Sequence, residues 1–182
     1  MRVISGSARG LKLLSLEGDS TRPTLDRVKE ALFSMLTPYI YSAKVLDLFA
    51  GSGALGIEAL SRGALSAVFV DSLPQAMDIV KENVSRAKFS DAATFELMDS
   101  LTYLKKSDTV FDIVFIDPPY KGNLYEACLL SLYENKLLTK ESIVVMEWDS
   151  ELTKPVISSS FEVIKERKYG RVMLTLLSPV TD

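Results

Sequence analysis

The stretch KVLDLFAGSGALG, residues 44–56, predicts a buried strand, a tight turn and the start of a helix. Residues 44–49 are almost continuously apolar, as expected for a strand of a parallel sheet that is covered on both faces. Gly51 and Gly53 allow the backbone to turn sharply and to approach a ligand closely. In open α/β sheets such a turn lies at the carboxyl edge, where ligands bind.

Short apolar strands continue to alternate with helices beyond this stretch. Strands are expected at residues 44–49, 67–71, 94–98, 111–116 and 143–148, and helices at 54–62, 74–89, 101–105 and 124–135. Two last strands, 161–167 and 172–177, flank Tyr169-Gly170 and predict an antiparallel hairpin at one sheet edge. The expected fold is α/β: a doubly wound, mostly parallel seven-stranded sheet of the Rossmann-like type.

The chain before residue 44 predicts a hairpin and a helix. Residues 2–5 and 11–14 are β-prone and are separated by Gly6 and Gly10. Thr24 can cap a helix with one apolar face, and Pro38 should end it. We therefore expect an amino-terminal β-hairpin extension at residues 1–20 and a main domain at residues 21–182.

Composition narrows the classes of function. With 47% apolar residues, the 182-residue chain can bury one substantial core. No apolar run approaches the roughly 18 residues of a membrane span, and no signal segment is evident, so we expect a cytoplasmic protein without a membrane partner. The chain has no histidine and a single cysteine, Cys128, so we expect no disulfide and no metal site.

The charge pattern leaves nucleic-acid binding to a local surface. The net charge of −3 gives no overall attraction to a phosphate backbone. Residues 1–16 carry Arg2, Arg9 and Lys12 and no acidic residue, and Arg27 and Lys29 follow nearby. This pattern indicates either a basic amino-terminal face or ordinary solvated surface charge.

Four aspartates stand at the ends of four successive predicted strands: Asp47, Asp71, Asp99 and Asp117. Ligands of doubly wound sheets lie beyond these strand ends, so the pattern predicts an acidic binding crevice. Four unrelated capping residues are the alternative. For Asp99 alone, an N-cap of the following helix is an equally good interpretation.

The identity of the ligand depends on Asp47. The sequence Gly51-Ser52-Gly53-Ala54-Leu55-Gly56, with Asp71 20 residues after its first glycine, matches a dinucleotide fingerprint and favours a nicotinamide cofactor. Asp47, however, would face the pyrophosphate, and like charges about 4 Å apart repel by roughly 4 kcal/mol. S-adenosylmethionine has no phosphate and carries a sulfonium cation, so it fits better.

Each predicted site residue then has a role toward S-adenosylmethionine. Asp47 favours the cationic end, and Asp71 accepts hydrogen bonds from both ribose hydroxyls. Asp99 accepts from the adenine amino group, with Phe49 as an apolar neighbour. The turn residues Gly51 and Gly53 let the backbone approach the methionine part.

Asp117-Pro118-Pro119-Tyr120 follows an apolar strand and can hold a planar group that carries an amine. The Asp117 carboxylate and the Pro118 carbonyl can accept two N–H bonds from one amine. Two successive prolines stiffen this bend, and Tyr120 offers a ring for stacking. An ordinary strand-to-loop turn is the alternative, because Asp-Pro commonly begins turns.

These motifs resemble those of class I amino-methyltransferases. More narrowly, the chain resembles the RsmD-type family, which methylates the N2 amine of a guanine in 16S ribosomal RNA, through the residues Arg2-Val3-Ile4-Ser5-Gly6, Arg9-Gly10, Arg22-Pro23-Thr24, Arg27, Glu30, Phe33 and Tyr169-Gly170. The resemblance implies a monomeric bacterial enzyme that uses S-adenosylmethionine and acts on the assembled or assembling small ribosomal subunit.

The resemblance also suggests residue roles. It implies RNA contacts for Arg2, Arg9, Lys12, Arg27 and Pro119. A role for Thr24 in a lid over the cofactor is as well supported as a simple helix start.

We expect Asp117 and Pro118 to orient the amine, Tyr120 to stack on an extruded base, and Asp117 or water to take the proton. Alternatives are methylation of DNA adenine or protein glutamine, a noncatalytic RNA-binding assembly factor, and a nicotinamide oxidoreductase. Cys128 and Trp148 are interpreted as packing residues. Glu147 is interpreted as a solvated strand end, with a position facing the ligand as the alternative.

Overall fold

The computed structural model describes residues 1–16, 23–119 and 124–180, with the backbone alone for residues 23–25. Its helices are α1 (Pro23–Ile40), α2 (Ala54–Ser61), α3 (Pro74–Arg86), α4 (Ser100–Lys106) and α5 (Leu124–Glu134), with a short 3₁₀ turn at Ser90–Ala92. Its strands are β1 (Lys44–Asp47), β2 (Ser66–Asp71), β3 (Ala93–Leu97), β4 (Phe111–Ile116), β5 (Leu138–Asp149), β6 (Phe161–Tyr169) and β7 (Val172–Pro179).

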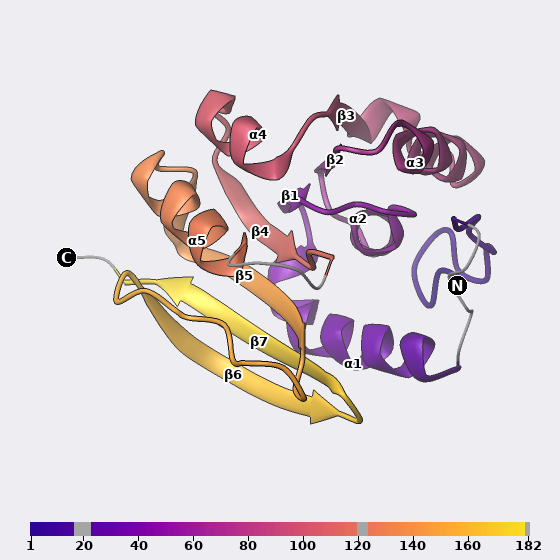
Figure 1. Cartoon of the computed structure of the whole chain (residues 1–182). Helices are drawn as coiled ribbons and strands as arrows, with labels where there is room; N and C mark the ends of the chain where they lie inside the picture. The colour runs from indigo at the N-terminus through magenta and orange to yellow at the C-terminus, as the bar shows by residue number, and fades with distance from the viewer. Residues whose placement is uncertain (17–22, 120–123, 181–182) are drawn as a thin grey trace.

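The strands of the described chain form one seven-stranded sheet in the order β3-β2-β1-β4-β5-β7-β6 (Figure 1). The first five strands in this order are parallel, whereas β7 runs antiparallel to both β5 and β6. The predicted doubly wound sheet with an antiparallel last hairpin is confirmed. The strand order reverses between β1 and β4, which is where ligands bind in such sheets.

Each face of the sheet has its own apolar core, because successive strand residues point to opposite faces. Helices α1, α2 and α3 cover one face, where Val45 and Phe115 are buried, and α4 and α5 cover the other, where Leu46 and Val114 are buried (Figure 1). Cys128 is fully buried in the second core. Trp148 is also buried there, and its Nε1 donates to Thr175 Oγ1 at 3.0 Å, so both residues pack as predicted.

Several predicted boundaries differ from the structure, and for α1 and β5 the physical reason is clear. Helix α1 continues past Pro38 to Ile40, because a proline near a helix end removes only one hydrogen bond, while Ile40 gains a buried position. Strand β5 begins at Leu138 rather than at residue 143. The first half of β5 is polar, so a search for apolar runs did not predict it as a strand. In the structure Leu138 pairs with Phe111, and the Phe111 carbonyl accepts a hydrogen bond from Ser142 Oγ at 2.7 Å.

The first residues of the chain form a small hairpin, but its two arms share only an isolated antiparallel bridge, Arg2 to Lys12, and not the strands predicted at 2–5 and 11–14. The Val3 amide donates to the Leu11 carbonyl at 2.9 Å, and the Leu13 amide donates to the Met1 carbonyl at 3.0 Å. Val3 and Leu13 are buried in the same core as α1 and α2. The domain boundary after residue 20 stays a prediction. Within the described ranges, no helix is both long and apolar enough to cross a membrane.

Candidate active site at the carboxyl edge of the sheet

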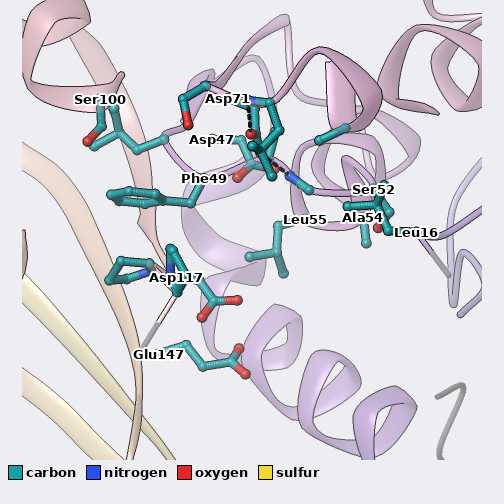
Figure 2. A pocket seen from close by; sticks show the side chains of 18 of the residues that line it. Leu16, Asp47, Phe49, Ser52, Ala54, Leu55, Asp71, Ser100, Asp117 and Glu147 are labelled. Carbon is teal, nitrogen blue, oxygen red and sulfur yellow. Dashed lines mark hydrogen bonds between the residues drawn. The ribbon is translucent and has the colours of Figure 1, made fainter. Parts of the chain in front are cut away.

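A cavity of about 600 Å³ opens at the carboxyl ends of the central strands. Its size is typical of sites that bind small molecules. All four predicted aspartates, Asp47, Asp71, Asp99 and Asp117, line this cavity together with Glu147. Figure 2 labels Asp47, Asp71, Asp117 and Glu147 around it. The sequence-based expectation of an acidic crevice is therefore met by residues from five different strand ends.

The glycine turn leads from β1 into α2 in a conformation that favours glycine. Gly51 and Gly53 have φ angles of 55° and 78°, and Gly53 is the N-cap of α2. A Cβ atom at Gly56 would lie 2.3 Å from the ring of Phe69, so this third glycine allows α2 to pack closely against β2. The turn thus brings backbone amides and little side-chain bulk to the cavity wall.

Asp47 is buried at the end of β1, with only 2% of its surface exposed. One carboxylate oxygen accepts the Gly56 amide at 3.1 Å. Burial raises the pKa of Asp47 to about 7, and the nearby charge of Asp71 acts in the same direction. A cation in the cavity would favour the ionised form of Asp47, whereas a pyrophosphate would oppose it.

Asp71 and Asp99 are held by backbone amides at the cavity wall. Asp71 accepts the amides of Gly51 and Leu73, each at 2.9 Å. Asp99 accepts the Thr102 amide at 2.9 Å as the N-cap of α4. Hydrogen bonding from the Thr102 side chain, and then from its amide, lowers the pKa of the Asp99 carboxyl. Asp99 therefore both caps a helix and lines the cavity. Each carboxylate has further acceptor capacity for a ligand hydroxyl or amine.

The bend after β4 forms another part of the wall. Asp117, the buried Pro118 and the exposed Pro119 all line the cavity. The predicted stacking residue Tyr120 lies outside the described residues. For Thr24 the structure describes the backbone, in the first turn of α1, but not the side chain.

Glu147 faces the cavity, which favours the alternative interpretation over the preferred one of a solvated strand end. It lines the cavity from β5, and Figure 2 shows its carboxylate pointing into the same space as that of Asp117. Burial raises its pKa to about 6. The strand pairing places Glu147 in the site. Met146 pairs with Ile116, so Glu147 and Asp117, the next residues, lie at the same edge of the sheet.

The amino-terminal hairpin is held by Glu58, a fully buried residue of α2. Its carboxylate accepts the Ile4 and Ser5 amides at 2.8 and 3.0 Å. It also pairs with Lys29 at 3.2 Å and with Arg62 at 2.8 Å. Lys29 is itself buried, so it does not belong to an exposed basic face as its sequence neighbours suggested.

Asn83 of α3 connects the hairpin to the glycine turn. Its side chain bonds both the amide and the carbonyl of Leu14, at 2.8 and 2.9 Å, and donates to the Ser52 carbonyl at 2.9 Å. Ser15 and Leu16, which follow Leu14, line the cavity. Sequence reasoning missed Asn83 and Glu58 because neither stands in a motif.

The four predicted basic contacts are all exposed on or beside this hairpin. Arg9 and Lys12 lie in the hairpin, and Arg27 lies in the first half of α1. Arg2 is exposed as well, but its Nε pairs with Asp26 at 3.1 Å. A phosphate contact by Arg2 would therefore compete with an existing ion pair.

The sheet order with antiparallel β7, together with the acidic crevice behind a glycine turn, defines a class I methyltransferase. S-adenosylmethionine, the cofactor of this class, fits the residues that are present: a buried carboxyl for a cation, Asp71 for a diol, and Asp99 for an amine.

The chain belongs to the family described as Conserved hypothetical protein 95, whose family model matches residues 1–178. It is 39% identical over 180 residues to the Ribosomal RNA small subunit methyltransferase D of Haemophilus influenzae, covering 97% of this chain and 92% of that protein. The Escherichia coli protein of the same name is 35% identical over 176 residues, covering 97% of this chain and 88% of its own length.

A solved structure of the Escherichia coli protein yhhF superposes with a TM-score of 0.89 at 31% identity, covering 100% of this chain and 99% of that one. These similarities confirm the resemblance inferred from the sequence motifs, including the use of S-adenosylmethionine.

Proposed function

We propose that this protein transfers a methyl group from S-adenosylmethionine to the N2 amine of a guanine in 16S ribosomal RNA. The observation that carries the proposal is that the Asp117-Pro118 bend lines the same cavity as Asp47, Asp71 and Asp99. A clamp for an amine and a site for the cofactor thus share one cavity. The similarity to two proteins named small subunit methyltransferase D favours ribosomal RNA over DNA or protein as the acceptor.

The crevice then has two parts. The donor half consists of the ends of β1, β2 and β3 with Asp47, Asp71 and Asp99, and it holds the cofactor. The acceptor half consists of the ends of β4 and β5 with Asp117, Pro118 and Glu147. When bound, the cofactor supplies a methyl group that its positive sulfur makes electrophilic.

Within the acceptor half, Asp117 and the Pro118 carbonyl accept the two amine hydrogens of the guanine. A guanine amine is a poor nucleophile because its lone pair is conjugated with the ring. Two acceptors favour a pyramidal nitrogen and aim the lone pair along the line of transfer. Positive charge that develops on the nitrogen then lies beside a carboxylate that is already in place.

The target base must leave its stack to reach the cavity, because a stacked base is sterically blocked. We assign stacking on the extruded base to Tyr120, and phosphate contacts to Arg9, Lys12 and Arg27. Arg2 would join them after releasing Asp26. We further propose a monomeric, cytoplasmic enzyme whose substrate is the assembled or assembling small subunit.

Purified protein incubated with methyl-labelled S-adenosylmethionine and small subunits from cells that lack the modification tests the proposal. Digestion of the RNA should yield labelled N2-methylguanosine, and the Asp117→Ala variant should yield little. Label in another nucleoside or in protein would contradict the proposed acceptor. A parallel reaction with protein-free 16S RNA shows whether the assembled particle is required.

A further inference from the structure

A second carboxylate stands beside the amine clamp. Ile116 of β4 pairs with Met146 of β5, so Asp117 and Glu147 follow a matched pair on neighbouring parallel strands. Such strands lie about 4.8 Å apart. Figure 2 shows both carboxylates pointing into the cavity, and both residues line it.

The backbone of Glu147 is held from two sides. In the sheet it pairs with Leu174 of β7, and its carbonyl accepts the Tyr125 hydroxyl at 2.7 Å. Its neighbours Met146 and Trp148 are both buried, on the opposite face of the sheet from its own side chain. The position of this carboxylate is therefore set by the fold and not by a loop.

The candidate acceptors, adenine, cytosine, glutamine and guanine, differ in the hydrogen-bonding atom next to the carbon that bears their NH₂ group. Adenine has the N1 acceptor beside its N6 amine, cytosine has the N3 acceptor beside its N4 amine, and a glutamine amide has its own carbonyl oxygen. Guanine alone has a donor, N1–H, beside its N2 amine. A second carboxylate next to an amine clamp therefore suits guanine and repels the other three.

We infer that Glu147 is a specificity-determining residue whose carboxylate accepts the N1–H of the target guanine while Asp117 accepts from the N2 amine. This inference rests on the proposed guanine-N2 activity and adds the group that selects guanine. Glu147 is half-buried. When a ligand lacks the donor that such an acceptor needs, the acceptor is left without a hydrogen bond, and the ligand is rejected. As N2 gains positive charge, N1–H becomes more acidic, so the bond to Glu147 strengthens during methyl transfer.

The test uses small subunits reconstituted with 16S RNA that carries either guanine or 2-aminopurine at the target nucleotide. 2-Aminopurine keeps the 2-amino group but has an unprotonated N1, which accepts instead of donating. The wild-type protein should favour guanine in kcat/KM by at least tenfold. Glu147→Gln should lower this preference at least fivefold, because an amide can accept from N1–H or donate to N1.

Glu141→Gln is the matched control, since it makes the same exchange at an exposed residue of the same strand. It should keep the wild-type preference. Affinity for S-adenosylhomocysteine should stay within about twofold in both variants. An unchanged guanine preference in Glu147→Gln would overturn the inference, and so would weakened cofactor binding with an unchanged preference, which would place Glu147 on the cofactor.

If Glu147→Gln does not fold, Glu147→Asp tests the same point, because it keeps the carboxylate but draws it back from the cavity by one methylene. The guanine preference should then fall at least threefold, and an unchanged value would refute the role of Glu147. Failure of the proposed function looks different: the wild-type protein would form no N2-methylguanosine even on guanine-containing subunits.

Discussion

The donor half and the acceptor half of the crevice take their carboxylates from different parts of the sheet. Asp47, Asp71 and Asp99 each accept at least one hydrogen bond from a backbone amide of the glycine turn or of a following loop or helix. Asp117 and Glu147 point into the cavity from the ends of the adjacent strands β4 and β5 (Figure 2). The bonds of Asp47 to Gly56 and of Asp99 to Thr102 follow from nearby chain geometry. The bond of Asp71 to Gly51 and the meeting of Asp117 with Glu147 depend on which strands become neighbours.

Replacing Asp117 should give the largest effect and should leave the donor half intact. We expect Asp117→Ala to lower the single-turnover rate about 100- to 1000-fold, because the developing charge loses its preorganised partner. The affinity for S-adenosylhomocysteine, measured by calorimetry, should change by less than about threefold.

Asp112→Ala is a suitable control for that variant. Asp112 is exposed at the opposite end of β4, where it accepts the Lys44 amide at 2.7 Å. Its replacement should leave the rate near that of the wild type. A rate for Asp117→Ala equal to that of the control would remove Asp117 from the mechanism.

Replacing Asp71 should have the opposite effect: it should weaken cofactor binding but change turnover little. Loss of hydrogen bonds from two ribose hydroxyls to a carboxylate should weaken S-adenosylhomocysteine binding about 10- to 100-fold in Asp71→Ala. Turnover at saturating cofactor should fall only a few-fold. Asp78→Ala, an exposed residue of α3, is the control. If Asp71→Ala instead lowered turnover and left cofactor affinity unchanged, the assignment of cofactor binding to the donor half would be wrong.

The buried carboxyl of Asp47 should make cofactor affinity depend on pH. Its pKa is raised to about 7, so the ionised fraction grows as the pH rises from 6 to 8, and only this form attracts a cation. Affinity for S-adenosylmethionine should therefore rise about tenfold over this range, with release of a proton on binding. Calorimetry in buffers of different ionisation enthalpy measures both quantities. Asp47→Asn should flatten the profile, and an equally steep profile in that variant would exclude Asp47 as the source.

The smallest effect should come from the basic residues outside both halves. Arg9→Ala and Lys12→Ala should each reduce the slope of log affinity against log salt by about one, measured with the small subunit. Arg2→Ala should change it less, because Arg2 already pairs with Asp26. Cofactor affinity should not change. Equal slopes in wild type and in the Arg9–Lys12 double variant would rule out this surface.

Much of the fold follows from contiguous residues. The alternation of apolar strands and helices, the turn through Gly51 and Gly53, and the bend at Asp117-Pro118-Pro119 are local features of the sequence. The strand-end aspartates could be predicted as a group because parallel strands bring their carboxyl ends to one edge. These features needed no knowledge of which strand lies beside which.

The remaining features depend on contacts between distant residues. Glu147 enters the site because β5 pairs with β4, and Lys29 is buried because Glu58 lies across from it. Asn83 joins Leu14 to Ser52 although 31 residues separate it from the glycine turn. Local propensity contains no information about such neighbours. Burial and pairing, which set the protonation and direction of these side chains, exist only once the sheet and its helices have assembled.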